Sequence, residues 1–449
     1  MSGTSQGMPD RVRIHPSTLD GEVAVAGDKS IGHRCLLIGA LAEGPVEVSG
    51  LETSADIAAT AEGLRRLGVR VDLAVGSDGR LDGVVEGPIS RDPDALQVAI
   101  DCGNSGTTLR LLAGLAAGSG RSVVLDGDAS LRRRPVGRIM APLSAMGVRC
   151  EAREERFPPL TVHGGPVSDV RWESPVASAQ VKSAILLAAV AGNVSAEIVS
   201  PAPSRDHTER MLIHGGMRVT TSTDADGHEC VLIGPGRPTL TTVSAPRDPS
   251  AAAFWHVAAA CGAGTITTSG ICLNPGRTGA LDVLRWMGAS VHVAEERTVG
   301  GEPVGDVTVA PGALSGAVVA GALVVRCLDE LPVLALAGAL SQDGLVVRDA
   351  AELRVKESDR ISVLATTLRA LGIEVTEQPD GFVVPGGQRP RGGSVAAHGD
   401  HRIAMTAAVA AAVGTGPVDI AGFAAVGTSY PGFLSDLASL GGRVEAHDD

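Results

Sequence analysis

Two kinds of helix alternate along the chain, and they differ in the spacing of their apolar positions. The first kind is one-sided. In residues 56–67 and 360–371 apolar side chains recur at i, i+3, i+4 and i+7, which predicts an amphipathic helix with one buried face. A glycine follows each of these helices, as expected where a helix ends in a left-handed residue. Strand-like alternation then begins, for example at Val69, Val71 and Leu73.

This junction of helix, glycine and strand recurs six times, about 70 to 85 residues apart. The six junctions are Leu67-Gly68, Met146-Gly147, Gly215-Gly216, Met287-Gly288, Leu371-Gly372 and Leu440-Gly441. Self-similarity at a regular period is the signature of a repeated structural unit. The sequence therefore predicts six copies of one α/β unit.

The second kind of helix is apolar nearly all round, which predicts burial on every side. The segments of this kind are 35–44, 109–118, 181–192, 251–262, 332–344 and 403–414. Each unit would thus hold an outer helix, a buried helix and several short strands. Six units divide into three and three, and we place the crossover near Ala245, before Asp248 and Pro249, which suit a helix N-terminus. The strand at 12–15 could complete either half.

Composition narrows the class of protein. The chain has 449 residues, more than one hydrophobic core usually holds, so two domains are expected. A formal net charge of -13 argues against a binder of nucleic acid or of acidic membranes. Seven cysteines without a C-x-x-C pair indicate reduced thiols. No apolar stretch approaches the roughly 20 residues of a membrane span. These features predict a soluble cytoplasmic protein.

Polar residues gather at the start of every buried helix. The segments are GDKSIGHR (27–34), GNSGTTLR (103–110), SAQVK (178–182), RDPS (247–250), DELP (329–332) and GDHRIAM (399–405). Helix N-termini present unpaired N–H groups and the positive end of the helix dipole, so they favour anions. Lys29, Arg34, Arg110 and Arg402 would add full positive charges. We therefore expect an anion-binding site where these helix ends face one another.

Each segment taken alone also has a purely structural interpretation. GDKS could be an ordinary capped helix, and Glu357 could be one partner of a surface salt bridge. The three arginines at 132–134 could lie in a solvated turn. His398 and His401 have no further ligands at useful spacing, so no metal site is predicted.

Taken together, the segments resemble the EPSP synthase family along about residues 12–445. GDKSIGHR, GNSGTTLR, RRRPVGR (132–138), SAQVK, RDHTE (205–209), RVKESDR (354–360) and GDHRIAM occur in the order and spacing of that family. The pairing of SAQVK with RDHTE resembles the second class of the family, which includes members tolerant of glyphosate. The resemblance implies two inverse α/β domains, each of three βαβαββ units, with the active site in the cleft between them. One domain would comprise 1–27 with 246–449, and the other 28–245.

The resemblance also implies an activity and a set of site residues. The family transfers the enolpyruvyl group of phosphoenolpyruvate to the 5-hydroxyl of shikimate 3-phosphate and releases phosphate, without a cofactor. Shikimate 3-phosphate would contact Lys29, Ser30, Arg34, Ser178, Gln180, Arg205, Asp329 and Lys356. Phosphoenolpyruvate would contact Lys29, Gly106, Arg134, Gln180, Arg360 and Arg402. Asp329, Glu357 and Lys29 would act in catalysis, in a monomeric cytoplasmic enzyme with no nucleic-acid or membrane partner.

Some positions depart from the family pattern or bear on alternative functions. Thr428 stands where many members carry a phosphoenolpyruvate-binding lysine, so no ligand role is assigned to it. UDP-N-acetylglucosamine enolpyruvyl transferases carry a cysteine five residues before the Arg-Pro pair, and Ala129 occupies that position here. A transferase acting on a secondary-metabolite cyclitol and an inactive ligand-binding homologue are further alternatives.

Overall fold

The computed structural model describes residues 8–87 and 97–447, which form two compact units. Unit 1 holds the described residues up to Ala26, then Arg247–Arg297 and the chain from Pro303 onward. Unit 2 holds Gly27–Pro246 together with the short segment Thr298–Glu302. The family resemblance implied that residues 298–302 belong to the first domain, within the range 246–449. In the structure they belong to unit 2, because a local sequence pattern carries no information on where a hairpin tip packs.

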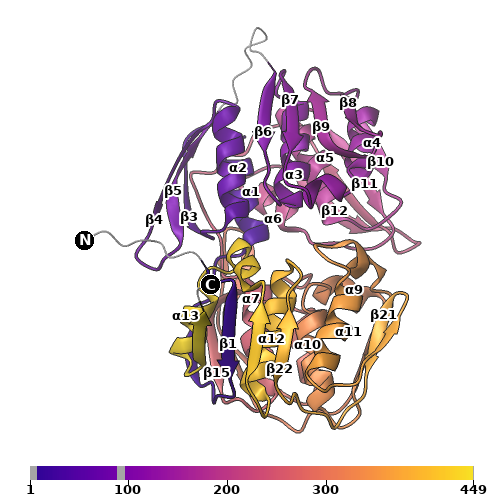
Figure 1. The fold of residues 1–449 in the computed structure, drawn as a ribbon. Coiled ribbons are helices and arrows are strands. Elements are labelled where there is room, and N and C mark those ends of the chain that lie inside the picture. The colour runs from indigo at the N-terminus through magenta and orange to yellow at the C-terminus, as the bar shows by residue number, and fades with distance from the viewer. Residues whose placement is uncertain (1–7, 88–96, 448–449) are drawn as a thin grey trace. The chain divides into compact units, whose positions relative to one another are not determined.

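Three four-stranded sheets make up the strands of unit 2 (Figure 1). The first is ordered β14 (Thr242–Ser244), β3 (Val46–Leu51), β5 (Leu81–Glu86), β4 (Arg70–Val75). The second is β6 (Val98–Asp101), β7 (Ser122–Asp126), β9 (Phe157–His163), β8 (Arg149–Arg153). The third is β10 (Val170–Glu173), β11 (Ala196–Ser200), β13 (Glu229–Ile233), β12 (Val219–Thr223).

Unit 1 has three sheets of the same design. The first is ordered β2 (Gly21–Val23), β15 (Ile266–Cys272), β17 (Glu302–Ala310), β16 (Ser290–Val299). The second is β18 (Ala317–Val319), β19 (Leu345–Val347), β21 (Gly381–Val384), β20 (Thr376–Gln378). The third is β22 (Gly393–Ala396), β23 (Val418–Ala421), β1 (Arg11–His15), β24 (Arg443–His447). In all six sheets the first two strands run parallel and the third runs antiparallel to the second.

The N-terminal strand β1 completes the last sheet of unit 1. It lies between β23 and β24 and pairs antiparallel with both, so the indigo strand stands among the yellow C-terminal elements in Figure 1. Val12 and Ile14 point into the core and are fully buried. The sequence left the partner of this strand open, because strand pairing across 400 residues has no local signature.

The six apolar helices are buried, as predicted. They are α1 (Lys29–Gly39), α3 (Gly106–Ala117) and α5 (Ala179–Gly192) in unit 2, and α7 (Pro249–Ala260), α10 (Leu331–Leu340) and α12 (His401–Val413) in unit 1. Small residues let them pack closely. A Cβ atom on Gly114 of α3 would lie 2.2 Å from the carbonyl oxygen of Ala184 in α5, so these two backbones are in direct contact.

The outer helices all end in the same way. They are α2 (Ala55–Arg66), α4 (Gly137–Ala145), α6 (His207–His214), α8 (Gly279–Met287), α11 (Arg360–Ala370) and α13 (Phe433–Ser439). The glycine of each predicted junction has a φ between 78° and 101°. Its N–H and the next N–H donate back to carbonyls of the last turn, as Gly68 does to Arg65 and Val69 to Leu64. This is the Schellman arrangement, in which only glycine avoids the strain of the left-handed conformation.

Shorter helical segments connect these elements. The short segments are α9 (Ala322–Cys327), η1 (Leu131–Arg133), η2 (Ala351–Val355) and η3 (Phe423–Thr428).

The few aromatic residues concentrate in unit 1. Trp255 stacks on Phe433 with ring centroids 4.8 Å apart and donates a 3.0 Å hydrogen bond to the Tyr430 hydroxyl. The remaining core is built mainly of aliphatic side chains. Within the described residues, no helix combines the length and apolar character needed to cross a bilayer.

Candidate active site

The residues predicted to bind substrates fall into two groups, one in each unit. Unit 2 holds Lys29, Ser30, Arg34, Gly106, Arg134, Ser178, Gln180 and Arg205, and unit 1 holds Asp329, Lys356, Glu357, Arg360 and Arg402. Most lie at or just before the start of a helix, and five of the six buried helices are capped by a side chain. The capping residues are Asp28, Ser105, Ser178, Asp248 and Asp400. These caps fix the helix ends at which the remaining N–H groups can meet an anion.

Lys29 is the first residue of α1 and pairs with a carboxylate that the sequence did not single out. Its Nζ lies 3.0 Å from Oδ2 of Asp56, in the first turn of α2, and both side chains remain partly exposed. The ammonium group is thereby held in one place while it stays accessible to solvent. Asp56 could not have been identified from the sequence, because nothing in its neighbourhood indicates that α2 begins beside α1.

Arg34 lies deeper in unit 2 and joins three helices. Its Nε donates to Thr208 Oγ1 at 2.7 Å, its Nη2 to Ser183 Oγ at 2.8 Å, and its Nη1 to the carbonyl oxygen of Ser30 at 2.6 Å. The residue is only 3% exposed. Burial lowers the pKa of Arg34 to about 10, which leaves it charged at neutral pH. Arg34 therefore fixes α1 against α5 and α6.

Two guanidinium groups lie over the start of α3. A Cβ atom on Gly106 would lie 2.6 Å from Arg110 Nη1 and 3.5 Å from Arg134 Nη1, so the absence of a side chain gives both arginines room. Arg110 Nη1 donates to Gln180 Oε1 at 2.8 Å, and Gln180 Nε2 donates to Thr107 Oγ1 at 3.0 Å. The start of α3 is thus linked to the start of α5. Arg110 was expected to add positive charge to the anion-binding helix ends, but the family resemblance assigned it to neither substrate.

Arg205 immediately precedes α6, whose N-cap is Asp206, and is partly exposed. Ser178 is the N-cap of α5 and accepts from the N–H of Val181 at 3.5 Å. Arg205 is also close enough to Arg34 for its positive charge to lower the pKa of that residue. The start of α6 therefore brings a second guanidinium group near Arg34.

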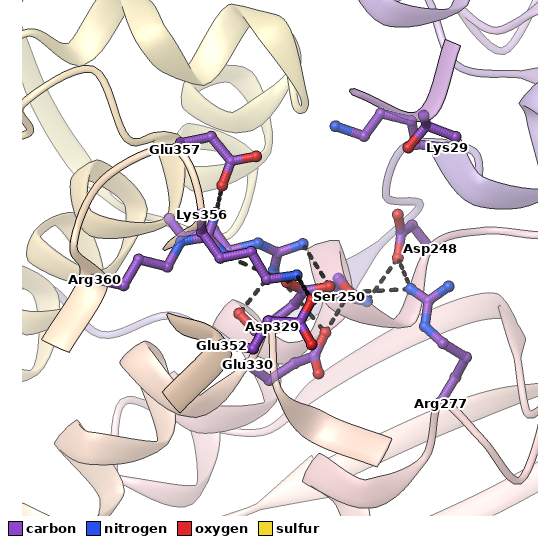
Figure 2. Close-up of polar contacts among 12 residues, drawn as sticks. Lys29, Asp248, Ser250, Arg277, Asp329, Glu330, Glu352, Lys356, Glu357 and Arg360 are labelled. Atoms are coloured by element: carbon purple, nitrogen blue, oxygen red, sulfur yellow. Dashed lines mark hydrogen bonds and ion pairs between the residues drawn. The ribbon is translucent and has the colours of Figure 1, made fainter. Parts of the chain in front are cut away.

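In unit 1, one buried arginine binds three carboxylates (Figure 2). Arg360 Nη1 lies 3.2 Å from Asp329 Oδ1, its Nε lies 2.8 Å from Asp400 Oδ2, and its Nη2 donates to Glu357. The residue is 1% exposed. Burial would lower the pKa of Arg360, but the three carboxylates together raise it above its ordinary value. Arg360 is thus a permanent charge that orients both predicted proton-transfer groups.

Lys356 and Arg402 surround the same aspartate. Lys356 Nζ lies 3.7 Å from Asp329 Oδ1 and 3.5 Å from Glu352 Oε1. Arg402 Nη1 donates to the carbonyl oxygen of Asp329 at 3.0 Å, and its Nη2 lies 4.0 Å from Asp329 Oδ2. All five residues predicted in this unit therefore belong to one network centred on Asp329.

Asp400, which the sequence analysis did not assign to the site, supports this network from α12. Its Oδ2 accepts from Arg360 Nε at 2.8 Å and from Ser358 Oγ at 2.9 Å, and its Oδ1 caps the N–H of Arg402 at 3.0 Å. Burial would raise the pKa of Asp400, but Arg360 and His401 hold it below its usual value. The carboxylate stays charged and fixes two of the predicted ligands.

A second buried chain of contacts reaches Arg402 from α7. Arg277 Nη2 donates to Asp248 Oδ1 at 2.8 Å and to Ser250 Oγ at 3.0 Å. Ser250 in turn donates to Glu330, whose Oε1 lies 3.9 Å from Arg402 Nη1. Figure 2 shows this chain beside Asp329. The starts of α7, α10 and α12 are thereby locked together in unit 1.

Two further sequence-based expectations concern a threonine and a metal site. Thr428 donates its hydroxyl to the carbonyl oxygen of Ala425 at 2.8 Å, within its own short helix. Among residues 8–87 and 97–447, one grouping has side chains close enough to hold a cation: Asp224, Asp226 and His228, in the turn between β12 and β13. None of the predicted site residues belongs to it.

The arrangement of six repeated sheets in two units is the fold of enolpyruvyl transferases. The solved enolpyruvyl transferase NikO from Streptomyces tendae superposes with a TM-score of 0.76 over 99% of this chain and 100% of its own, at 19% identity, which compares the fold alone. The chain belongs to the EPSP synthase (3-phosphoshikimate 1-carboxyvinyltransferase) family, whose model matches residues 14–437.

Relatives and solved structures agree over nearly the full length. The 3-phosphoshikimate 1-carboxyvinyltransferase of Roseiflexus sp. (strain RS-1) is 47% identical over 436 residues, covering 95% of this chain and 98% of the relative. That of Herpetosiphon aurantiacus is 45% identical over 432 residues, with coverage of 95% and 98%. The solved EPSP synthase from Acinetobacter baumannii has a TM-score of 0.82 at 36% identity, covering 97% of this chain and 99% of its own.

Proposed function

We propose that this chain transfers the enolpyruvyl group of phosphoenolpyruvate to the 5-hydroxyl of shikimate 3-phosphate and releases inorganic phosphate. The observation that carries the proposal is the network in unit 1, where Arg360 and Lys356 hold two partly exposed carboxylates, Asp329 and Glu357. Membership of the EPSP synthase family supports the choice of substrates.

Shikimate 3-phosphate would bind mainly through unit 2. Arg205 is proposed to bind its phosphate, since a guanidinium group pairs with phosphate through two parallel hydrogen bonds. Ser178 and Gln180, at the start of α5, would hold the ring and its carboxylate, with help from Lys29 and Ser30. Arg34 would contribute through its hold on the Ser30 carbonyl and on Thr208.

Phosphoenolpyruvate is proposed to bind to cationic side chains. Gly106 has no side chain, which leaves room for the guanidinium groups of Arg110 and Arg134. Arg110 is held in place by its hydrogen bond to Gln180. Arg360 and Arg402 supply two further guanidinium groups in unit 1, and Lys29 an ammonium group in unit 2. Several cations are required because phosphate and carboxylate must be held side by side against their mutual repulsion.

Three proton transfers complete the reaction. The 5-hydroxyl loses its proton as its oxygen adds to C2 of phosphoenolpyruvate, while C3 gains a proton. The tetrahedral intermediate then loses a proton from C3 and phosphate from C2. Asp329 is proposed to act near the 5-hydroxyl, and Glu357 at C3. Glu357 contacts Arg360 directly, so an incoming substrate anion that pairs with Arg360 would release Glu357 for proton transfer.

Glu357→Gln tests the assignment of roles. The change keeps the size of the side chain and removes its ability to carry a proton, so we expect kcat to fall by about 10² to 10⁴-fold. The dissociation constant for shikimate 3-phosphate should stay within about threefold, because Glu357 pairs with Arg360, which is a proposed phosphoenolpyruvate ligand. Steady-state phosphate release and titration calorimetry would measure the two quantities.

Glu352→Gln is the matched control. Glu352 also pairs with Lys356, but it is half exposed and has no proposed proton to transfer. It should retain at least half of the activity. If Glu357→Gln and Glu352→Gln released phosphate at similar rates, the role given to Glu357 would be wrong.

We also propose an oligomeric state and a cellular location for this chain, and that its reaction uses no cofactor. One chain carries both groups of ligands, so we propose that a monomer suffices and that no cofactor takes part. Both substrates are phosphorylated and cannot diffuse across a membrane, which favours the cytoplasm as the site of action. A solution mass well above 45.4 kDa by light scattering would contradict the monomer.

A further inference from the structure

The hairpin formed by β16 and β17 crosses from one unit to the other. Both strands belong to a sheet of unit 1, yet its tip, Thr298–Glu302, belongs to unit 2. The chain therefore enters unit 2 twice, once for the long segment that begins at Gly27 and again for five residues. No sequence motif marks this tip, and the proposed mechanism assigns it no task.

The backbone of the tip is packed tightly against unit 2. Gly300 and Gly301 have φ values of 58° and 86°, which favour glycine. A Cβ on Gly300 would lie 2.8 Å from the carbonyl oxygen of Ser244, at the end of β14, and one on Gly301 would lie 2.8 Å from that of Arg210 in α6. Both glycines are therefore needed for the close approach as well as for the turn.

The next residue, Glu302, places its carboxylate inside unit 2. It is 1% exposed, and its Oε1 lies 2.7 Å from Nδ1 of His207, which is also 1% exposed. Its Oε2 lies 3.9 Å from Arg210 Nε. A carboxylate buried to this extent is stable only when it is paired, and so is the imidazole opposite. The pair therefore fixes the position of His207.

His207 is the first of three anchored residues at the start of α6. Thr208 Oγ1 accepts from Arg34 Nε at 2.7 Å, and Glu209 Oε1 lies 2.6 Å from the buried Nζ of Lys182. Burial would lower the pKa of Lys182, but Glu209 and Glu229 raise it above its ordinary value, so Lys182 stays charged. Thr208 and Glu209 are thus held from α1 and α5. His207 is held from the hairpin.

We propose that Glu302 is a positioning residue for the phosphate of shikimate 3-phosphate and that it acts through Arg205. Arg205 is two residues before His207, at the point where the chain turns into α6. Fixing His207 therefore sets the direction in which the Arg205 backbone leaves the helix. The inference rests on the proposed function, in which Arg205 binds that phosphate.

Glu302→Gln tests this role, because glutamine keeps the shape of the side chain and removes its charge. We expect the dissociation constant and KM for shikimate 3-phosphate to rise about tenfold, with kcat at saturation within about threefold of the unmodified chain. The dissociation constant for shikimate, which lacks the phosphate, should change less than twofold. Gly301→Ala, which displaces the tip without changing a charge, should act in the same direction.

Glu296→Gln, on the exposed part of the same hairpin, is the control and should bind shikimate 3-phosphate as the unmodified chain does. A double-mutant cycle tests whether Glu302 acts through Arg205. In an Arg205→Ala background, Glu302→Gln should weaken binding less than twofold further.

Equal weakening of shikimate and shikimate 3-phosphate would overturn the proposal, as would unchanged binding of both or a full tenfold loss without Arg205. These outcomes differ from a failure of the proposed function, in which the unmodified chain would release no phosphate from the two substrates.

Discussion

At the scale of single residues, buried charge determines most of the site. Arg360 binds Asp329, Glu357 and Asp400, and the negative charge in excess is met by Lys356 and Arg402. Removing one member of such a network leaves the remaining buried charges without a partner of opposite sign, which destabilises the folded state. The residue types were predictable from the sequence. The convergence of Asp400 on Arg360 was not, because it depends on how α11 packs against α12.

Buried histidines predict how stability depends on pH. Burial lowers the pKa of His256 to about 3, and its Nε2 lies 2.7 Å from Thr268 Oγ1. In the unfolded chain the pKa is about 6.5, so the unfolded state takes up a proton first as the pH falls. The stabilisation by neutral His256 is therefore complete above pH 6.5 or so and is lost progressively toward about pH 3.

His256→Gln should remove this contribution. We expect the drop in the free energy of unfolding between pH 7 and pH 5 to be smaller than in the unmodified chain by about 2 kcal/mol, from about 1.4 kcal/mol per pH unit. Urea titrations at the two pH values would measure it. His292→Gln, at an exposed position, should leave the drop unchanged. Identical pH dependence in His256→Gln and the unmodified chain would rule out the explanation.

At the scale of elements, local chemistry was sufficient to predict most of the fold. The six junction glycines were predicted to be left-handed, and all six are. The buried helices were predicted from their lack of a polar face, and Asp248 and Pro249 begin α7 as expected. Partners distant in the sequence could not be predicted from the local pattern, which left β1 free to join either half. Only the family resemblance grouped residues 1–27 with 246–449, and that range includes the hairpin tip Thr298–Glu302, which the structure groups with unit 2. Both depend on tertiary packing, which periodicity does not encode.

Three glycine substitutions distinguish the cost of backbone strain in the left-handed conformation from the cost of a steric clash at the added Cβ. Gly147 has a φ of 86°, and a Cβ there would make only an ordinary contact, 3.8 Å from Ser168 Oγ, so Gly147→Ala should cost about 1 to 2 kcal/mol from the left-handed conformation alone. Gly288→Ala should cost more, since its Cβ would also lie 2.8 Å from the Ala313 carbonyl oxygen. Gly137→Ala, in the first turn of α4 with nothing within 4 Å, should be neutral or stabilising by up to about 1 kcal/mol. Urea unfolding would rank them. A Gly147→Ala variant as stable as Gly137→Ala would refute the strain argument.

At the scale of the whole molecule, six copies of one sheet and helix design provide six buried helices in the described part of the chain, and the starts of five of them, α1, α3, α5, α10 and α12, carry proposed ligands. The repeat was readable from the sequence because each copy repeats the same local pattern. The distribution of site residues between the copies was not, and came from the resemblance to a family. The repeat thus explains the scaffold. The residues at the individual helix starts differ between the copies, and they would supply the proposed chemistry.

The choice of acceptor tests the proposed function most directly. The purified chain would be assayed for phosphate release from phosphoenolpyruvate with shikimate 3-phosphate, and separately with UDP-N-acetylglucosamine or without an acceptor. We expect one phosphate to be released for each shikimate 3-phosphate consumed, and no release above background in the other two reactions. Release with UDP-N-acetylglucosamine but not with shikimate 3-phosphate, or no release with either, would contradict it.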